Sequence, residues 1–377
     1  MNNRQSHEKA ATVISRNGEF DFFKFIASIF IALFHSYSFY GDKRIVAPGG
    51  VLAVEYFFLV TGFLFASSVY RDTRKFSSET IGEETCSFVL RKIRGFLPYF
   101  ILGFALSLVM LTFSGKISFT RSPGRLLDVM VDLLLLRETG LPLTSVLGVD
   151  WYFSSMVIVL FILYPIFRFR KNLFSYWIAP IIGIGCIAYL FMKGGQINLG
   201  NGVSIGIMTA GTCRAFGDIC LGVVAWRVAM WIKSLGCMSR GVCRHFLSIV
   251  GLTSMAMACA IMAFVEQPAH QHVALILFFC CVSITGSRTA SVNSLYKPGL
   301  CGFLGKWSLS IFLTHSSLRW LLLALSRRMA WLAELMSARD TLSITALIAI
   351  YLSSSLVLGL VGMLICEPLQ KRLSQCH

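Results

Sequence analysis

The chain has 377 residues, of which 56% are hydrophobic and only 14% are charged. This composition excludes a soluble enzyme, a secreted disulfide scaffold and a disordered chain, because the apolar residues gather in runs of about twenty, the length of helix that crosses a ~30 Å hydrocarbon layer. Lys and Arg number 34 against 18 Asp and Glu, a formal net charge of +16. In a membrane protein such an excess usually serves orientation, so we expect no nucleic-acid partner.

The apolar runs predict an all-α bundle of about ten transmembrane helices in a lipid bilayer. We expect a polar N-terminal segment at 1–21 without a removable signal peptide, one membrane domain at 22–369 and a short tail at 370–377. The predicted spans lie near residues 22–40, 50–70, 96–114, 152–167, 176–192, 205–232, 246–265, 271–287, 307–326 and 342–365.

A further apolar run at 126–136 is too short to span and carries Asp128 and Asp132, so we expect an interfacial or re-entrant piece there. With that choice, 20 Lys and Arg lie in segments on the side of the chain ends, 10 lie on the other side and four lie within spans. This bias predicts that both termini are cytoplasmic. Arg327 and Arg328 run against it locally.

Cysteine usage agrees with this topology, because none of the 12 cysteines lies in a segment assigned to the outside. Cys280 and Cys281 are adjacent, and Cys213 and Cys220 are seven residues apart, so no paired CxxC zinc pattern is present. We therefore expect no disulfides and no metal, and interpret the cysteines as small apolar filler.

Ionisable groups inside a bilayer are costly, so each one is a candidate for function. The first span carries Asp21, Lys24 and His35. The 11 residues from Lys24 to His35 make about three turns, so both lie on one helix face, ~16 Å apart along the axis. The alternative is that Lys24 reaches the interface and His35 bonds a neighbouring helix for structural reasons alone.

Two further groups favour a functional interpretation. Glu55 lies near the outer end of the second span, at a depth similar to that of His35, where a carboxylate would orient the imidazole. Arg91, Lys92 and Arg94 precede the third span on the cytoplasmic side, where the arginines would bind phosphate, or serve orientation alone. Together these groups suit a long, phosphate-headed donor whose reactive end lies deeper in the membrane.

Another pair of ionisable groups lies in the sixth span. Arg214 and Asp218 are four residues apart on one helix face, and we expect them to neutralise each other.

Five blocks of the sequence occur in the order and spacing of the membrane acyltransferase-3 family, and the chain resembles that family from about Glu19 to Leu369. The blocks are EFDFFKFIASIFIALFHS, GVLAVEYFFLVTGFLFA, RKIRGFLPY, GVDWYFSSMVIVLFILYPIF and FLGKWSLSIFLTHSSL. The family comprises bacterial integral-membrane enzymes that O-acylate, mostly O-acetylate, surface polysaccharides, lipopolysaccharide and related glycans.

The resemblance implies roles for individual residues. His35 matches the family's catalytic histidine, and Lys24 stands where the family has an Arg, eleven residues earlier. The Glu55 block matches the family pattern except that Thr61 replaces Ser. The remaining matches are to the basic pair, the WY block and the late histidine, which fall on Arg91, Arg94, Trp151, Tyr152 and His315.

The function implied by the resemblance is transfer of an acetyl or other short acyl group from acetyl-CoA or another acyl-CoA to a glycan hydroxyl, in the bacterial inner membrane. His35 and Glu55 would be catalytic, Lys24, Arg91 and Arg94 would bind the donor, and Trp151, Tyr152 and His315 would bind substrate. His35 would act either as a general base or as a transient acyl carrier. The alternatives are a transporter or exporter without transfer chemistry, and an inactive scaffold. The oligomeric state is not indicated.

Overall fold

The computed structural model describes residues 17–40, 46–117, 125–141, 145–200, 203–236, 241–265, 269–287 and 298–375. The long helices are α2 (Gly18–His35), α3 (Ala53–Arg71), α4 (Ile81–Phe113), α6 (Asp150–Phe169), α8 (Ala179–Gly194), α9 (Ala210–Ser234), α10 (Gly241–Phe264), α11 (Ala269–Ser287), α12 (Pro298–Leu325) and α14 (Thr341–Gln375). The shorter elements are η1 (Ser36–Phe39), η2 (Gly50–Leu52), α5 (Arg125–Leu133), η3 (Arg137–Thr139), α7 (Lys171–Leu173), η4 (Phe174–Ile178), β1 (Ser204–Ile205), β2 (Met208–Thr209) and α13 (Ala330–Ser337).

Ten helical segments in the described ranges are long and apolar enough to cross a membrane, which confirms the predicted all-α membrane bundle. Helix α5 has nine residues and is not among them, so the run at 126–136 adds no span to the topology. The main difference from the predicted boundaries is in the third span. Helix α4 begins at Ile81 instead of near residue 96, so the basic residues at 91–94 lie within a continuous helix.

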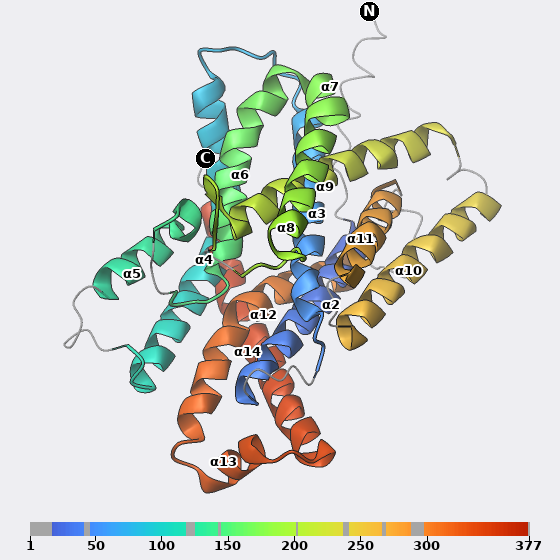
Figure 1. Cartoon of the computed structure of the whole chain (residues 1–377). Helices are drawn as coiled ribbons and strands as arrows, with labels where there is room; N and C mark the ends of the chain where they lie inside the picture. The colour runs from blue at the N-terminus through green and yellow to red at the C-terminus, as the bar shows by residue number, and fades with distance from the viewer. Residues whose placement is uncertain are drawn as a thin grey trace, which may run out of the picture.

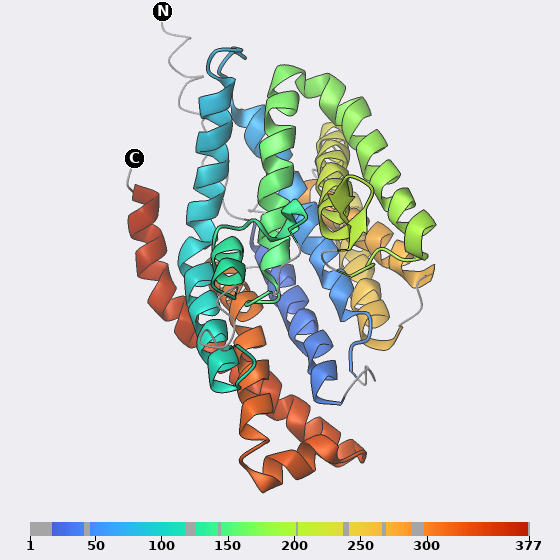
Figure 2. The same ribbon diagram turned by 60° about the vertical axis from the view of Figure 1, so that its left-hand side comes forward.

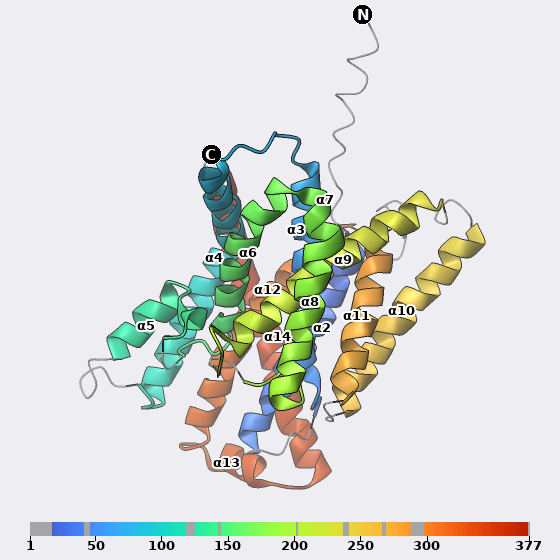
Figure 3. The same ribbon diagram turned by 45° about the horizontal axis from the view of Figure 1, so that its top comes forward.

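The centre of the bundle is formed by α2, α3 and α12 (Figure 1). Helix α12 packs on α2, α4 and α14, while α3 packs on α9 and α11. Helix α10 covers α11 at one edge (Figure 3). Helix α13 lies at one end of the bundle and α14 finishes towards the other (Figure 2). We call these the α13 end and the opposite end.

Helices α2 and α12 lie side by side and run in the same direction. Near their starts, the Ser308 hydroxyl donates to the Lys24 carbonyl oxygen at 2.8 Å. Near their ends, the Arg319 guanidinium lies 3.4 Å from His35. The first helix is also tied at its start, where the Asn17 side chain accepts from the Glu19 N–H and donates to the Thr285 carbonyl. This N-cap satisfies an amide that would otherwise be unpaired.

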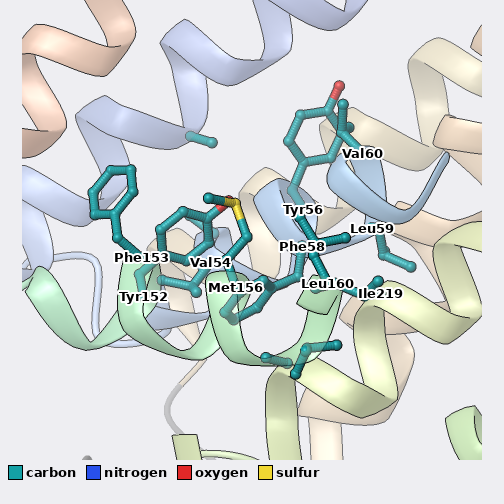
Figure 4. Close-up of a cluster of buried hydrophobic side chains, with 14 of the residues drawn as sticks. Val54, Tyr56, Phe58, Leu59, Val60, Tyr152, Phe153, Met156, Leu160 and Ile219 are labelled. Carbon is teal, nitrogen blue, oxygen red and sulfur yellow. The ribbon is translucent and has the colours of Figure 1, made fainter. Parts of the chain in front are cut away.

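Helices α3 and α9 approach each other closely at two glycines. A Cβ on Gly62 would lie 2.0 Å from the Ile219 carbonyl oxygen, and a Cβ on Gly222 would lie 2.2 Å from that of Leu59. Small residues allow such backbone contact between membrane helices. Beside this crossing, apolar side chains of α3 and α6 interdigitate, with Ile219 of α9 next to them (Figure 4).

We expect Gly222→Ala to lower the melting temperature of the purified protein, because the added methyl must push the α3 backbone away. Overpacking of this kind costs about 1–3 kcal/mol. Thermal unfolding in detergent measures the change. Gly185→Ala is the matched control, since no atom lies within 4 Å of that Cβ position. Equal melting temperatures for the two variants would contradict this description of the crossing.

Candidate active site

A cavity of about 310 Å³ lies between α2, α3, α4, α6 and α12. Three lysines line it, one each from α2, α4 and α12: Lys24, Lys92 and Lys306. Its wall is largely aromatic, formed by Phe57, Phe96, Tyr99, Tyr152, Phe153 and Phe312. A basic, aromatic cavity inside a membrane bundle can hold a ligand that has both an anionic and an apolar part.

Helix α4 explains why Lys92 lies in this cavity. Lys92, Gly95, Phe96 and Tyr99 all line it, and their spacing of i, i+3, i+4 and i+7 places them on one helix face. Lys92 makes no ion pair within the described part of the chain, and its ammonium group lies 5.5 Å from the centre of the Phe88 ring. A cation held in this way is available to a ligand.

The structure separates the predicted donor-binding residues. Lys24 lines the cavity, where its ammonium group lies 3.8 Å from the Asp21 carboxylate. Arg91 and Arg94 are on the same helix as Lys92, but neither lines the cavity, and Arg91 is exposed. The sequence analysis included Lys92 in the basic stretch but assigned donor binding to Arg91 and Arg94 instead. The helical stripe with Gly95, Phe96 and Tyr99 is the signal that could have identified it.

Of Trp151 and Tyr152 at the start of α6, Tyr152 lines the cavity and Trp151 does not. The Tyr152 ring lines the cavity and packs against the Phe58 ring at 4.5 Å between centroids, and its hydroxyl lies 3.4 Å from that of Thr61. Trp151 lies under the guanidinium of Arg214, at 5.4 Å. Tyr152 can contact a ligand in the cavity, whereas Trp151 packs behind the wall.

His35 does not line the cavity but lies beyond its wall, next to His315 and Arg319. The two imidazole rings are 5.1 Å apart between centroids, and an Arg319 nitrogen lies 3.4 Å from Nδ1 of His35. The structure thus brings His35 and His315 together, although 280 residues separate them in sequence. Arg319 is a site residue that the sequence analysis missed.

The hydrogen bonds define complementary tautomers for the two neutral imidazoles. An Arg guanidinium can only donate, so Nδ1 of His35 accepts and its proton is on Nε2. The Ile311 carbonyl can only accept, so Nδ1 of His315 donates to it at 3.0 Å. Nε2 of His315 then carries a lone pair, and no hydrogen-bond partner for it exists among the described residues. One ring can donate a proton where the other can accept one.

Phe312 lies between the cavity and the histidines. Its ring centroid is 5.7 Å from that of Phe57 and 5.5 Å from that of Tyr152, both in the cavity wall. On its other side it lies 6.3 Å from the His315 ring, one helical turn along α12. The Phe312 ring therefore lies between the cavity and the His315 ring.

Glu55 pairs with Arg214 in the structure. Both carboxylate oxygens accept from the guanidinium, Oε1 from Nε at 2.8 Å and Oε2 from Nη2 at 2.5 Å. The expected pairing of Arg214 with Asp218 is wrong, because the guanidinium is turned towards α3 and neither Asp218 oxygen has a hydrogen-bond partner among the described residues. A bidentate pair between an arginine and a carboxylate on two different helices has better hydrogen-bond geometry than a pair four residues apart on one helix.

A family model described as an acyltransferase domain matches residues 17–366, which is most of the chain. The chain belongs to the acyltransferase-3 family. Membership supports a membrane acyltransferase, the first of the functions that the sequence analysis considered. Comparisons with curated proteins and with solved structures gave no match. In the described part of this acyltransferase, no group of three or more His, Cys, Asp or Glu could hold a metal ion.

Two buried carboxyl groups, those of Asp132 and Asp150, fix the backbone that precedes α6. Asp132 accepts from the Val146 N–H at 2.5 Å, and Asp150 accepts from the Ser145 hydroxyl at 2.6 Å. Arg137 lies 3.8 Å from both. Burial, and then the charge of Asp150, raise the pKa of Asp132 to about 8. These groups hold the loop that precedes the WY pair.

Replacing Glu55 tests whether the ion pair is structural. We expect Glu55→Gln to destabilise the folded protein by about 3–5 kcal/mol, because it leaves the Arg214 charge buried without a partner. The double variant Glu55→Gln/Arg214→Met should recover much of that loss. Thermal unfolding of both variants measures this. Wild-type stability of Glu55→Gln would contradict it.

The carboxyl pair predicts a pH dependence of stability. The folded protein keeps a proton on Asp132 that the unfolded chain releases above about pH 4, so folding takes up a proton and stability falls as pH rises from about 4 to about 8. Asp132→Asn stays neutral, and its melting temperature should fall less than that of wild type between pH 6 and 8. Between pH 6 and 8, wild type should lose about 1–2 kcal/mol more of its free energy of unfolding than Asp132→Asn does. An equal fall in melting temperature for wild type and Asp132→Asn across this pH range would contradict the prediction.

Proposed function

We propose that this acyltransferase moves an acetyl or other short acyl group from acyl-CoA to a hydroxyl of a cell-surface or lipid-linked polysaccharide. The observation that carries the proposal is the cavity with three lysines on its wall and two histidines beyond it. The site belongs in the bacterial cytoplasmic membrane, with both chain ends and the lysines on the cytoplasmic side, where acyl-CoA is made.

The dimensions of the site support acyl-CoA as the donor. Lys24 and His35 are 11 residues apart on one helix, or ~16 Å along its axis, comparable to an extended pantetheine arm. Lys24 and Lys92 bind the donor phosphates directly, and Arg91 and Arg94 attract the donor to the mouth of the cavity. The aromatic wall, with Tyr152, then contacts the pantetheine arm, and the thioester reaches past Phe312.

The reaction exchanges a thioester for an ester. The C–S bond of the thioester breaks, a C–O bond forms to the glycan hydroxyl, and the hydroxyl proton ends on the thiol of coenzyme A. Once Nδ1 of His35 is released from the Arg319 contact, His35 either accepts the hydroxyl proton during attack or carries the acyl group on its imidazole before transfer. His315, whose Nε2 holds a lone pair, is placed to receive the proton in either route.

The proposal predicts separate kinetic effects at the two ends of the site. Lys92→Gln should raise the apparent KM for acetyl-CoA about tenfold, the loss of one charge-assisted contact, with kcat retained. His35→Gln should lower kcat by about 10²–10⁴. Transfer of labelled acetyl groups by the purified protein to bacterial surface glycans measures both.

The control for Lys92→Gln is Lys75→Gln, which removes the same charge from an exposed position between α3 and α4. It should leave both constants near their wild-type values. The amount of folded protein in the membrane is measured for every variant. Full activity of His35→Gln, or a change in glycan KM alone for Lys92→Gln, would refute the proposed site.

A further inference from the structure

Arg319 is a buried cation with no described anionic partner. It is 9% exposed, and its Nε has no hydrogen-bond partner among the described residues. Its other nitrogens make two long contacts of 3.4 Å, to Nδ1 of His35 and to the Ser316 hydroxyl. An arginine at membrane depth is costly unless an anion compensates it. The guanidinium therefore has unused capacity for an anionic ligand.

Further positive charge surrounds Arg319 at the α13 end. The ammonium group of Lys116 lies 3.8 Å from the centre of the Trp320 ring, and the Arg319 guanidinium lies 4.5 Å from the same centre. Arg327 donates to the Ser114 carbonyl, two residues from Lys116. Desolvation and the charges of Arg319 and Arg327 lower the pKa of Lys116. Within the described ranges, none of these three cations forms an ion pair.

The backbone at Gly148 also passes close to Arg319. Gly148 has a φ of +83°, and a Cβ there would lie 3.9 Å from an Arg319 nitrogen and 3.4 Å from the Ser316 hydroxyl. This glycine is in the loop held by Asp132 and Asp150. The loop, Trp320 and Lys116 thus flank one guanidinium on the side away from the donor cavity.

We propose that Arg319, with Lys116 and Arg327, binds an anionic group of the glycan acceptor, either a carboxylate or a phosphate. Binding of this group places an acceptor hydroxyl beside His35. This inference rests on the proposed function. The acceptor enters from the α13 end, opposite the lysine-lined cavity. An anion that pairs with Arg319 competes with Nδ1 of His35 for the same guanidinium, so acceptor binding frees that nitrogen. Charge on the acceptor is the recognised feature.

The test uses the purified full-length protein in nanodiscs of phosphatidylcholine. The probes are a glucuronic acid oligosaccharide with its uncharged methyl ester, and a phosphorylated oligosaccharide with its dephosphorylated form. Two quantities are measured: KM for the acceptor with labelled acetyl-CoA, and the shift in melting temperature caused by each oligosaccharide without donor. At least one charged probe should have a KM about tenfold or more below that of its neutral counterpart.

The variants separate this site from general charge effects. Arg319→Gln and Lys116→Gln should lose the preference for the charged probe and its melting shift, with KM for acetyl-CoA unchanged. Arg339→Gln is the matched control, because it removes an exposed charge at the same end, 5.9 Å from the Tyr40 ring centre, and should retain the preference. The melting shift stays informative for Arg319→Gln even if turnover is lost.

Each outcome decides one of the two proposals. Transfer with equal KM for charged and neutral probes overturns the anion site and leaves the proposed function standing. A charge-dependent melting shift that requires Arg319, with no transfer to any probe, supports the anion site and overturns the proposed function. A melting shift produced by phosphatidylglycerol in the nanodisc and by none of the oligosaccharides assigns the site to a lipid headgroup and overturns the inference.

Discussion

The ion pair between Glu55 and Arg214 joins the two helices on which the rest of the bundle depends. It bridges α3 and α9 at a depth where neither charge can be hydrated, so each is tolerable only while the other is present. The close crossing at Gly62 and Gly222 brings the same two helices into backbone contact. The pair therefore fixes the position of α3, and with it the aromatic wall that α3 shares with α6.

A second constraint comes from the parallel packing of α2 and α12. Two helices that run in the same direction keep a constant offset, so contact at Ser308 and Lys24 near their starts implies contact near their ends as well. This offset brings His315 and Arg319 to His35. The chemistry of the site is therefore set by the register between the first and ninth spans.

Much of this architecture could be predicted from the sequence, because apolar runs of spanning length report directly on membrane helices. His35 and Lys24 could also be singled out as candidates, since a polar group in an apolar run stands out. The side chains that contact these residues could not be predicted from the sequence. Glu55 and His35 are at similar depths, yet depth does not give the rotation of a helix, and the carboxylate faces Arg214 instead. Likewise, Arg91 and Arg94 match a motif, but helix rotation places Lys92 in the cavity.

The arrangement of cations separates two tasks that a transferase in a membrane must combine. Lysines line the cavity on one side of Phe312, and Arg319 and Lys116 lie on the other side, with the histidines between them. The positive-inside bias accounts for basic residues on one side of a membrane only. Arg327, which runs against that bias, lies beside Lys116 at the α13 end. Positive charge retained where orientation does not require it is explained more simply by a ligand than by topology.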